Sequence, residues 1–168
     1  MTARTFVPEV FVLDVDGVMT TGQFFYDAQG KAYKVFGPDD SDGLSLLKRF
    51  LPIRFITGDH RGFPITERRI KHDMHYELDL VSTTHRAEWL AERFDLKRVV
   101  FMGDGIFDHL VMRQVGYAIA PQNAHPYAKA AAQYVCACAG GERAVAEACL
   151  HLLELFYEPF GPESPIIR

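Results

Sequence analysis

Wholly apolar runs alternate with amphipathic stretches along the chain. Residues 10–13 are all hydrophobic and stop at a pair of carboxylates, a pattern typical of a central parallel strand that is covered on both faces. Further strands are predicted at residues 53–56, 75–80, 99–102, 117–120 and 134–137.

Between these strands, apolar residues recur at the spacing of helices. Ser41 and Asp42 are good N-cap residues for a first helix, Pro64 suits the first turn of a second, and Thr83 or Thr84 can cap a third. The predicted helices cover residues 41–51, 64–72, 83–94, 107–115, 125–132 and 142–156.

A β-hairpin interrupts the alternation after the first strand. Residues 24–27 and 31–36 flank Gly30, which can adopt a positive φ. The remaining strands and helices specify an α/β layer fold with a mainly parallel sheet, since parallel neighbours need crossover helices. We therefore predict one domain over residues 1–158 with a hairpin flap at 24–36, followed by an irregular, Pro-rich tail at 159–168.

Composition and charge narrow the class of partner. The chain has 168 residues, of which 48% are hydrophobic and 24% charged, and a formal net charge of -4. This balance and the lack of a basic cluster give no reason to expect nucleic acid or a membrane surface. No apolar run approaches the roughly 20 residues of a membrane span, and residues 1–10 lack the long apolar core expected of a secretion signal. We expect a cytoplasmic protein with a small-molecule partner.

Carboxylates follow two of the predicted strands. Asp14 and Asp16 come after the first strand, and Asp104 and Asp108 come after the strand at 99–102. The carboxyl ends of parallel strands meet at one rim, where ligands of such sheets bind. Like charges this close are costly unless a cation joins them. The sequence therefore predicts a Mg²⁺ site made by these four side chains.

The same rim offers a route for phosphoryl transfer. Asp14 is the candidate nucleophile, since carboxylates form aspartyl-phosphates that split hydrolysis into two displacements. Asp16, two residues on, can protonate the leaving group and then activate water. Thr57 and the amide of Gly58, at the end of the strand at 53–56, can bind the phosphoryl oxygens. We predict a Mg²⁺-dependent phosphatase.

These residues stand in motifs that resemble a known family. Asp-Val-Asp-Gly-Val at 14–18, Ile-Thr-Gly at 56–58 and Gly-Asp-Gly-Ile-Phe-Asp at 103–108 resemble the successive motifs of the haloacid dehalogenase (HAD) superfamily of phosphatases. The short chain, the hairpin, and Gly140-Gly141 resemble the capless 3-deoxy-D-manno-octulosonate 8-phosphate phosphatases and their nonulosonate 9-phosphate relatives.

The resemblance implies a three-layer, Rossmann-like HAD fold without a cap domain. It also implies an essential Mg²⁺, a phosphorylated sugar acid as substrate, and a homotetramer whose neighbouring subunits help to close the site. The substrate expected on this basis is 3-deoxy-D-manno-octulosonate 8-phosphate or a nonulosonate 9-phosphate.

The chain departs from the family pattern at several positions. A family lysine on the helix before the fourth strand aligns with Thr83, so Arg86, one turn along, is the candidate substitute, with His85 as the alternative. Gly105 stands where Asp is common, and Asp59 and Ala146 stand where Arg is usual.

Two other functions fit parts of the pattern. The departures are also compatible with a catalytically degenerate module that is retained for binding or assembly. A phosphoacceptor signalling domain uses similar groups, but its acceptor Asp would follow the third strand, near Asp79. The Asp14–Asp16 pair followed by Gly17 favours the phosphatase over both.

Overall fold

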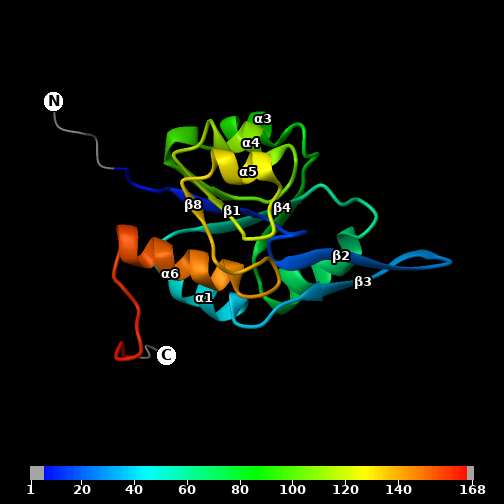
Figure 1. Cartoon of the computed structure of the whole chain (residues 1–168), viewed down its shortest axis with the longest axis horizontal. Helices are drawn as coiled ribbons and strands as arrows, with labels where there is room; N and C mark the ends of the chain where they lie inside the picture. Colours follow the sequence, from blue (N-terminus) through cyan, green and yellow to red (C-terminus); the bar gives the residue numbers. More distant parts are fainter. Residues whose placement is uncertain (1–5, 166–168) are drawn as a thin grey trace.

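The computed structural model describes residues 6–165 of the chain. A sheet of six parallel strands lies at its centre, and a hairpin projects to one side (Figure 1). In sheet order the strands are β5 (Glu77–Leu80), β4 (Ile53–Thr57), β1 (Val10–Asp14), β6 (Val99–Met102), β7 (Tyr117–Ala120) and β8 (Tyr134–Val135). The parallel sheet that the sequence predicts is confirmed, with the first strand near its middle.

Helices cover both faces of the sheet, which gives three layers (Figure 1). One face carries α1 (Asp40–Leu47), α2 (Phe63–Glu67), the π-helical segment η1 (Arg68–Asp73) and α6 (Ala144–Phe156). The other face carries α3 (Arg86–Ala91), α4 (Asp108–Met112) and α5 (Pro126–Ala131), and a 3₁₀ turn, η2 (Leu96–Arg98), precedes β6. Within residues 6–165, no helix is long and apolar enough to cross a lipid bilayer.

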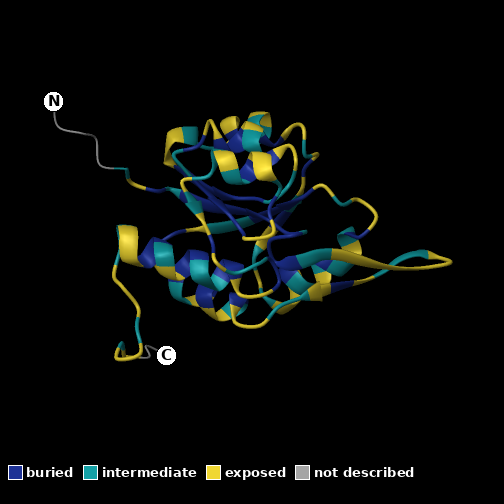
Figure 2. Ribbon diagram, in the orientation of Figure 1, coloured by how far each residue is buried: buried dark blue, intermediate teal, exposed yellow. Residues whose placement is uncertain are grey.

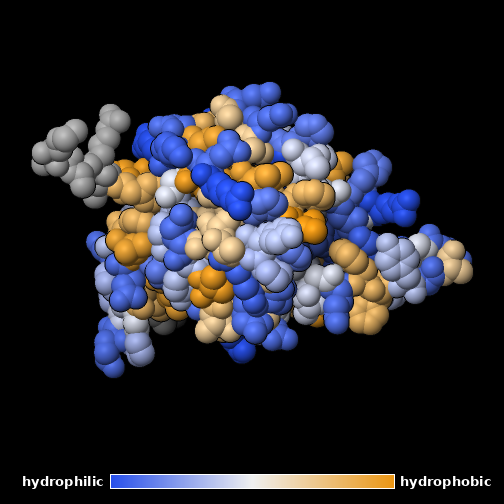
Figure 3. Space-filling model, turned by 45° about the horizontal axis from the view of Figure 1, so that its top comes forward, coloured by the Kyte–Doolittle hydropathy of each residue, from blue (hydrophilic) through white to orange (hydrophobic). Residues whose placement is uncertain are grey.

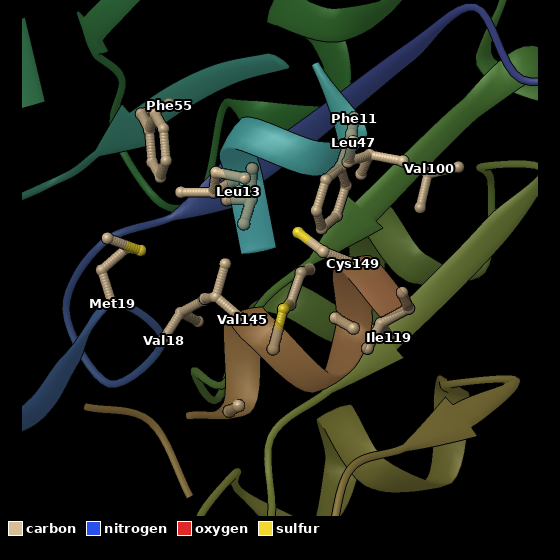
Figure 4. Packing of buried hydrophobic residues seen from close by; sticks show 14 of the residues in the cluster. Phe11, Leu13, Val18, Met19, Leu47, Phe55, Val100, Ile119, Val145 and Cys149 are labelled. Atoms are coloured by element: carbon tan, nitrogen blue, oxygen red, sulfur yellow. The ribbon is translucent and has the colours of Figure 1, made fainter. Parts of the chain in front are cut away.

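The alternation of side chains along β1 builds a core on each face. Phe11 and Leu13 belong to the cluster under α1 and α6, whereas Val10 and Val12 belong to the cluster under the other three helices. Figure 4 shows Phe11 and Leu13 among side chains from the neighbouring helices. Because both faces of β1 are covered, the whole strand is buried (Figure 2). This accounts for its unbroken apolar run.

The hairpin is longer than the sequence predicts. Its strands are β2 (Thr20–Asp27) and β3 (Gly30–Phe36), so pairing begins four residues earlier than the predicted start at residue 24. A register shift between Thr20 and Phe24 lets the ribbon twist away from the domain. Its outer part is mostly exposed (Figure 2).

The predicted cap of the first helix is wrong. Helix α1 begins at Asp40, one residue before Ser41, and its N-cap residue Asp39 has a φ of 64°. The Asp40 carboxylate instead accepts a hydrogen bond of 2.9 Å from the amide of Ala146 at the start of α6. A methyl group on Gly43 would lie 2.7 Å from the Cα of Ala146, so this glycine lets the two helices approach closely.

Other boundaries also differ from the prediction. Helix α3 starts at Arg86, after His85, and neither Thr83 nor Thr84 caps it. The predicted strand at 134–137 shortens to Tyr134–Val135, and α6 begins at Ala144 rather than at residue 142. The predicted tail at 159–168 is irregular as far as it is described, to residue 165.

Candidate active site

Three neighbouring strands deliver the predicted site residues to one rim. Strands β4, β1 and β6 are adjacent and parallel, so their carboxyl ends lie together. Strand β1 ends at Asp14 and β4 ends at Thr57, while Asp104 follows β6 by two residues. Asp108 is the first residue of α4 and is buried. The sheet thus gathers residues that are far apart in the sequence.

Three of the four predicted metal ligands form one group. A carboxylate oxygen from each of Asp14, Asp104 and Asp108 lies within 4.8 Å of the other two. Burial and the nearby Asp14 and Asp108 raise the pKa of Asp104 to about 8, because the uncharged form is favoured there. Oxygen donors that repel one another in this way fit a hard divalent cation. Asp16 is not part of this group.

Gly17 is needed beside this group. Its φ is +85°, and a Cβ at this position would overlap the carboxylate of Asp104. The turn after Asp16 therefore allows the motif at 14–18 and the motif at 103–108 to touch.

Arg86 binds two of the three clustered carboxylates. Its Nη1 and Nη2 donate to Oδ2 and Oδ1 of Asp14 at 2.8 and 2.9 Å, and Nη1 also donates to Oδ1 of Asp108 at 2.6 Å. The side chain is 2% exposed. Although burial opposes it, the two carboxylates raise the pKa of Arg86 further above its ordinary value. A permanently charged, bidentate donor thus faces the predicted nucleophile.

A cleft of about 390 Å³ opens over these groups. Its lining includes Asp14, Asp16, Gly58, Arg86 and Asp104. Thr83 also lines the cleft, so the position that aligns with the family lysine faces the site but carries no charge.

Thr57 is buried next to Gly58, which lines the same cleft. Its Oγ1 donates to Oδ2 of Asp16 at 3.3 Å and accepts from the amide of Asp59 at 3.1 Å. The hydroxyl is therefore already oriented toward the second carboxylate of the first motif.

A second cleft, of about 450 Å³, lies between α6 and β8. The carboxylate of Glu147, in the lining of this cleft, already accepts hydrogen bonds from the hydroxyl of Tyr134 and from the amides of Ala137 and Cys138. The cleft at the strand ends is the better candidate, because Asp14 and Asp104 of the clustered carboxylates line it.

Comparisons with known proteins agree with this geometry. Residues 88–148 match the family model described as haloacid dehalogenase-like hydrolase. A 3-deoxy-D-manno-octulosonate 8-phosphate phosphatase of Yersinia pestis is 33% identical over 147 residues, which are 83% of this chain and 76% of that protein. The chain belongs to the haloacid dehalogenase-like hydrolase family. It is a phosphatase, as its motifs predict.

Solved structures of this family share the fold. The 3-deoxy-D-manno-octulosonate 8-phosphate phosphatase of Moraxella catarrhalis, in complex with magnesium, phosphate and a KDO molecule, superimposes with a TM-score of 0.80 at 26% identity. The match covers 89% of this chain and 87% of that one. The cobalt-bound enzyme from Haemophilus influenzae has a TM-score of 0.77 at 26% identity, with 88% of each chain covered.

For a phosphatase of this family, the placement of Asp16 is the main difference from the predicted site. Its carboxylate contacts the hairpin rather than the acidic group: Nζ of Lys34 lies 2.8 Å from Oδ1 and 3.0 Å from Oδ2. Nζ of Lys34 also lies 2.8 Å from Oδ2 of Asp59 and donates to the hydroxyl of Thr66 at 2.8 Å.

Sequence reasoning missed the hairpin lysines. Lys31 donates to Oδ2 of Asp59 at 2.6 Å, and its ammonium lies 3.5 Å from the ring centre of Phe24. Partial burial opposes ionisation of Asp59, but hydrogen bonds from Lys31, Lys34 and the amide of Gly62 lower its pKa to about 2. The available signal in the sequence was the pair of lysines, Lys31 and Lys34, on the hairpin that follows Asp14 and Asp16.

The remaining candidates from the sequence lie elsewhere or act locally. His85 is exposed, so Arg86 is the residue of this pair that reaches the site. Asp79 lies within β5 and pairs with Arg54 at 2.7 Å, not with the acidic group. The amide of Gly105 donates to Asp108 at 2.8 Å, so the residue that replaces the common aspartate still orients a carboxylate.

Proposed function

We propose that this phosphatase hydrolyses the phosphate ester of a phosphorylated sugar acid, with Mg²⁺, through an aspartyl-phosphate on Asp14. The observation that carries the proposal is the convergence of Asp14, Asp104 and Asp108 beneath one cleft, with Arg86 bound to the first and third. Such a site provides a nucleophile and a place for a cation, which are the two requirements of this chemistry.

Asp14 has an oxygen available for attack. Its Oδ1 accepts from Arg86 and from the amide of Val15, whereas Oδ2 accepts only from Arg86 among the described residues. Because Oδ2 has fewer hydrogen-bond donors than Oδ1, we assign the attack on phosphorus to Oδ2. Arg86 holds the carboxylate in a single orientation and favours its ionised form against the effect of burial.

Asp16 handles the proton in both displacements. In the first, Oδ2 of Asp14 bonds to phosphorus while the ester P–O bond breaks, and protonated Asp16 gives its proton to the leaving alkoxide. In the second, Asp16 takes a proton from water, whose oxygen attacks phosphorus. The bond to Asp14 then breaks, inorganic phosphate leaves, and Asp16 is protonated again.

Other groups hold the transferring phosphoryl group. We infer that the Gly58 amide donates to its oxygens, because Gly58 follows β4 and lines the cleft. The neighbouring Thr57 hydroxyl would turn from Asp16 to these oxygens when substrate binds. Asp14, Asp104 and Asp108 would hold Mg²⁺. When bound, this ion would neutralise charge on the phosphoryl oxygens.

The substrate class rests on the relatives and on chemistry at the entrance of the cleft. The relatives from Yersinia pestis and Moraxella catarrhalis are named as phosphatases of an eight-carbon sugar acid phosphate. Lys31 lines the cleft here, so a cation is available near an anionic substrate. Asp59 beside it gives this entrance a mixed charge. We therefore propose sugar acid phosphates as the class of substrate, without choosing one member of it.

The experiment is a phosphate-release assay with and without Mg²⁺. We expect 3-deoxy-D-manno-octulosonate 8-phosphate or a nonulosonate 9-phosphate to have a higher kcat/KM than glucose 6-phosphate, which has no carboxylate. Chelation by EDTA should reduce the rate to background and added Mg²⁺ should restore it. Full activity in EDTA, or a preference for glucose 6-phosphate, would contradict the proposal.

We also propose that the chain forms a homo-oligomer through the hairpin. Phe25, Tyr26 and Tyr33 are 53%, 60% and 71% exposed, and Figure 3 shows hydrophobic side chains along this projection. An interface there would bury aromatic side chains, as protein interfaces commonly do.

Light scattering tests this assembly. The measured mass should exceed that of one chain, and replacement of Phe25 and Tyr26 by Ser should lower the mass. A monomer at high protein concentration would exclude this assembly.

A further inference from the structure

We propose that Lys34 of the hairpin is a positioning residue for Asp16, so that the hairpin supplies a working part of the active site. The inference rests on the proposed function, in which Asp16 transfers the proton. It concerns a residue outside the three motifs that define the site.

The ammonium of Lys34 is fully enclosed. Its side chain is 0% exposed, although β3 belongs to a mostly exposed ribbon. An ammonium is costly to bury unless its donors are matched. Here its three N–H groups face three partners, namely Asp16, Asp59 and Thr66, at 2.8 to 3.0 Å. Because all three donors are matched in this way, the ammonium of Lys34 has a fixed position.

Lys34 is the charged partner of Asp16 within the described residues. The other side-chain contact of Asp16 is the weaker one from Thr57, at 3.3 Å. Because Asp59 and Thr66 hold the same ammonium, its position does not depend on Asp16. Lys34 therefore provides a fixed point against which the Asp16 carboxylate is oriented at the edge of the cleft.

The cations of the site contact different carboxylates. Arg86 binds Asp14 and Asp108 and does not contact Asp16. Thr83, which also lines the cleft, contributes no charge. The positive charge beside the proton-transfer residue therefore comes from the hairpin. A change at Lys34 should affect proton transfer, whereas a change at Arg86 should affect the nucleophile.

The test compares two aryl phosphates of nearly equal shape. 4-Nitrophenolate leaves without needing a proton, whereas phenolate needs one, so the ratio of their kcat/KM values reports general acid catalysis. General acids contribute about 10²- to 10⁴-fold. We expect Lys34→Met to lower kcat/KM for phenyl phosphate at least about tenfold more than for 4-nitrophenyl phosphate.

Lys31→Met is the matched control. Lys31 lies on the same strand and shares the partner Asp59, but it does not contact Asp16. We expect this variant to leave the ratio of the two substrates unchanged. If Lys34→Met does not fold, Thr66→Val removes one anchor of the ammonium without touching Asp16 and should change the ratio in the same direction, by less.

The outcomes separate this inference from the proposed function. If the wild-type protein hydrolyses both esters and Asp14→Asn abolishes this activity, the proposed function is supported, whatever the result at Lys34. With that in place, an equal loss on both substrates, or no loss, in the folded Lys34 or Thr66 variant would overturn the role of Lys34 alone. Absence of wild-type hydrolysis of the two aryl esters and of the sugar acid phosphates, with Mg²⁺ present, would overturn both.

Discussion

Replacing Asp14 with asparagine is expected to abolish phosphate-ester hydrolysis while the protein stays folded. An amide oxygen is a poor nucleophile, and loss of a catalytic nucleophile costs roughly 10⁴-fold or more in kcat. Folding should persist because the new amide can still accept from Arg86, which keeps its contact with Asp108. The change also removes a negative charge that raises the pKa of Asp104. Steady-state kinetics and a thermal melt measure the two effects.

Asp79→Asn is the matched control for this change. Asp79 lies on β5 and pairs with Arg54 away from the cleft, so its loss should leave kcat unchanged. The same variant addresses the phosphoacceptor hypothesis, which assigns the acceptor to this region. Retention of more than about a tenth of the activity by Asp14→Asn, or inactivation by Asp79→Asn, would be incompatible with Asp14 as nucleophile.

The second large effect is expected at Arg86. Arg86→Met should lower kcat about 10²- to 10³-fold, the loss found when a charge-stabilising donor is removed. It should also lower the free energy of unfolding by about 3 to 5 kcal/mol, because Asp14 and Asp108 would stay buried without their shared partner. Kinetics together with urea denaturation separate the two effects.

Arg86→Lys tests the geometry of the guanidinium. The ammonium keeps the charge but cannot bind Asp14 through two parallel hydrogen bonds, so we expect intermediate activity. Arg93→Met is the control, since Arg93 is an exposed residue just after the same helix and pairs with its neighbour Glu92. A folded Arg86→Met variant with the wild-type rate would remove Arg86 from the catalytic site.

The sheet was predictable because its strands are buried on both faces. The unbroken apolar runs at residues 10–13 and 99–102 lie where the sequence predicts strands, and polar residues at their ends mark the rim. The carboxylates at the strand ends then predicted that Asp14, Asp16, Asp104 and Asp108 would meet, and the structure groups all of them except Asp16. Arg86 was inferred from its distance of one turn from Thr83.

Helix starts were less predictable, because tertiary contacts override local capping preference. Thr83 is a good N-cap by type, yet it lines the cleft beside Gly58, and the helix begins only at Arg86. Asp42 also has capping chemistry, but Asp40 is drawn to the start of α6 and α1 begins there.

The partners of Lys34 could not be read from the chain. Strand alternation in a projecting hairpin predicts an exposed lysine, but its ammonium meets residues from three other segments, at Asp16, Asp59 and Thr66. Only the three-dimensional packing of the hairpin base against α2 and the β4 loop creates this enclosed position. The placement of Asp16 away from the acidic group has the same origin.

The most direct measurement is identification of the residue that receives the phosphoryl group. The wild-type enzyme is mixed with substrate and Mg²⁺, quenched in acid within one turnover, reduced with borohydride and mapped by peptide mass spectrometry. We expect Asp14 to be converted to homoserine only when substrate is present, with Asp16 and Asp104 unchanged. Rapid turnover with no label at Asp14, or with the label on another side chain, would contradict the aspartyl-phosphate on Asp14.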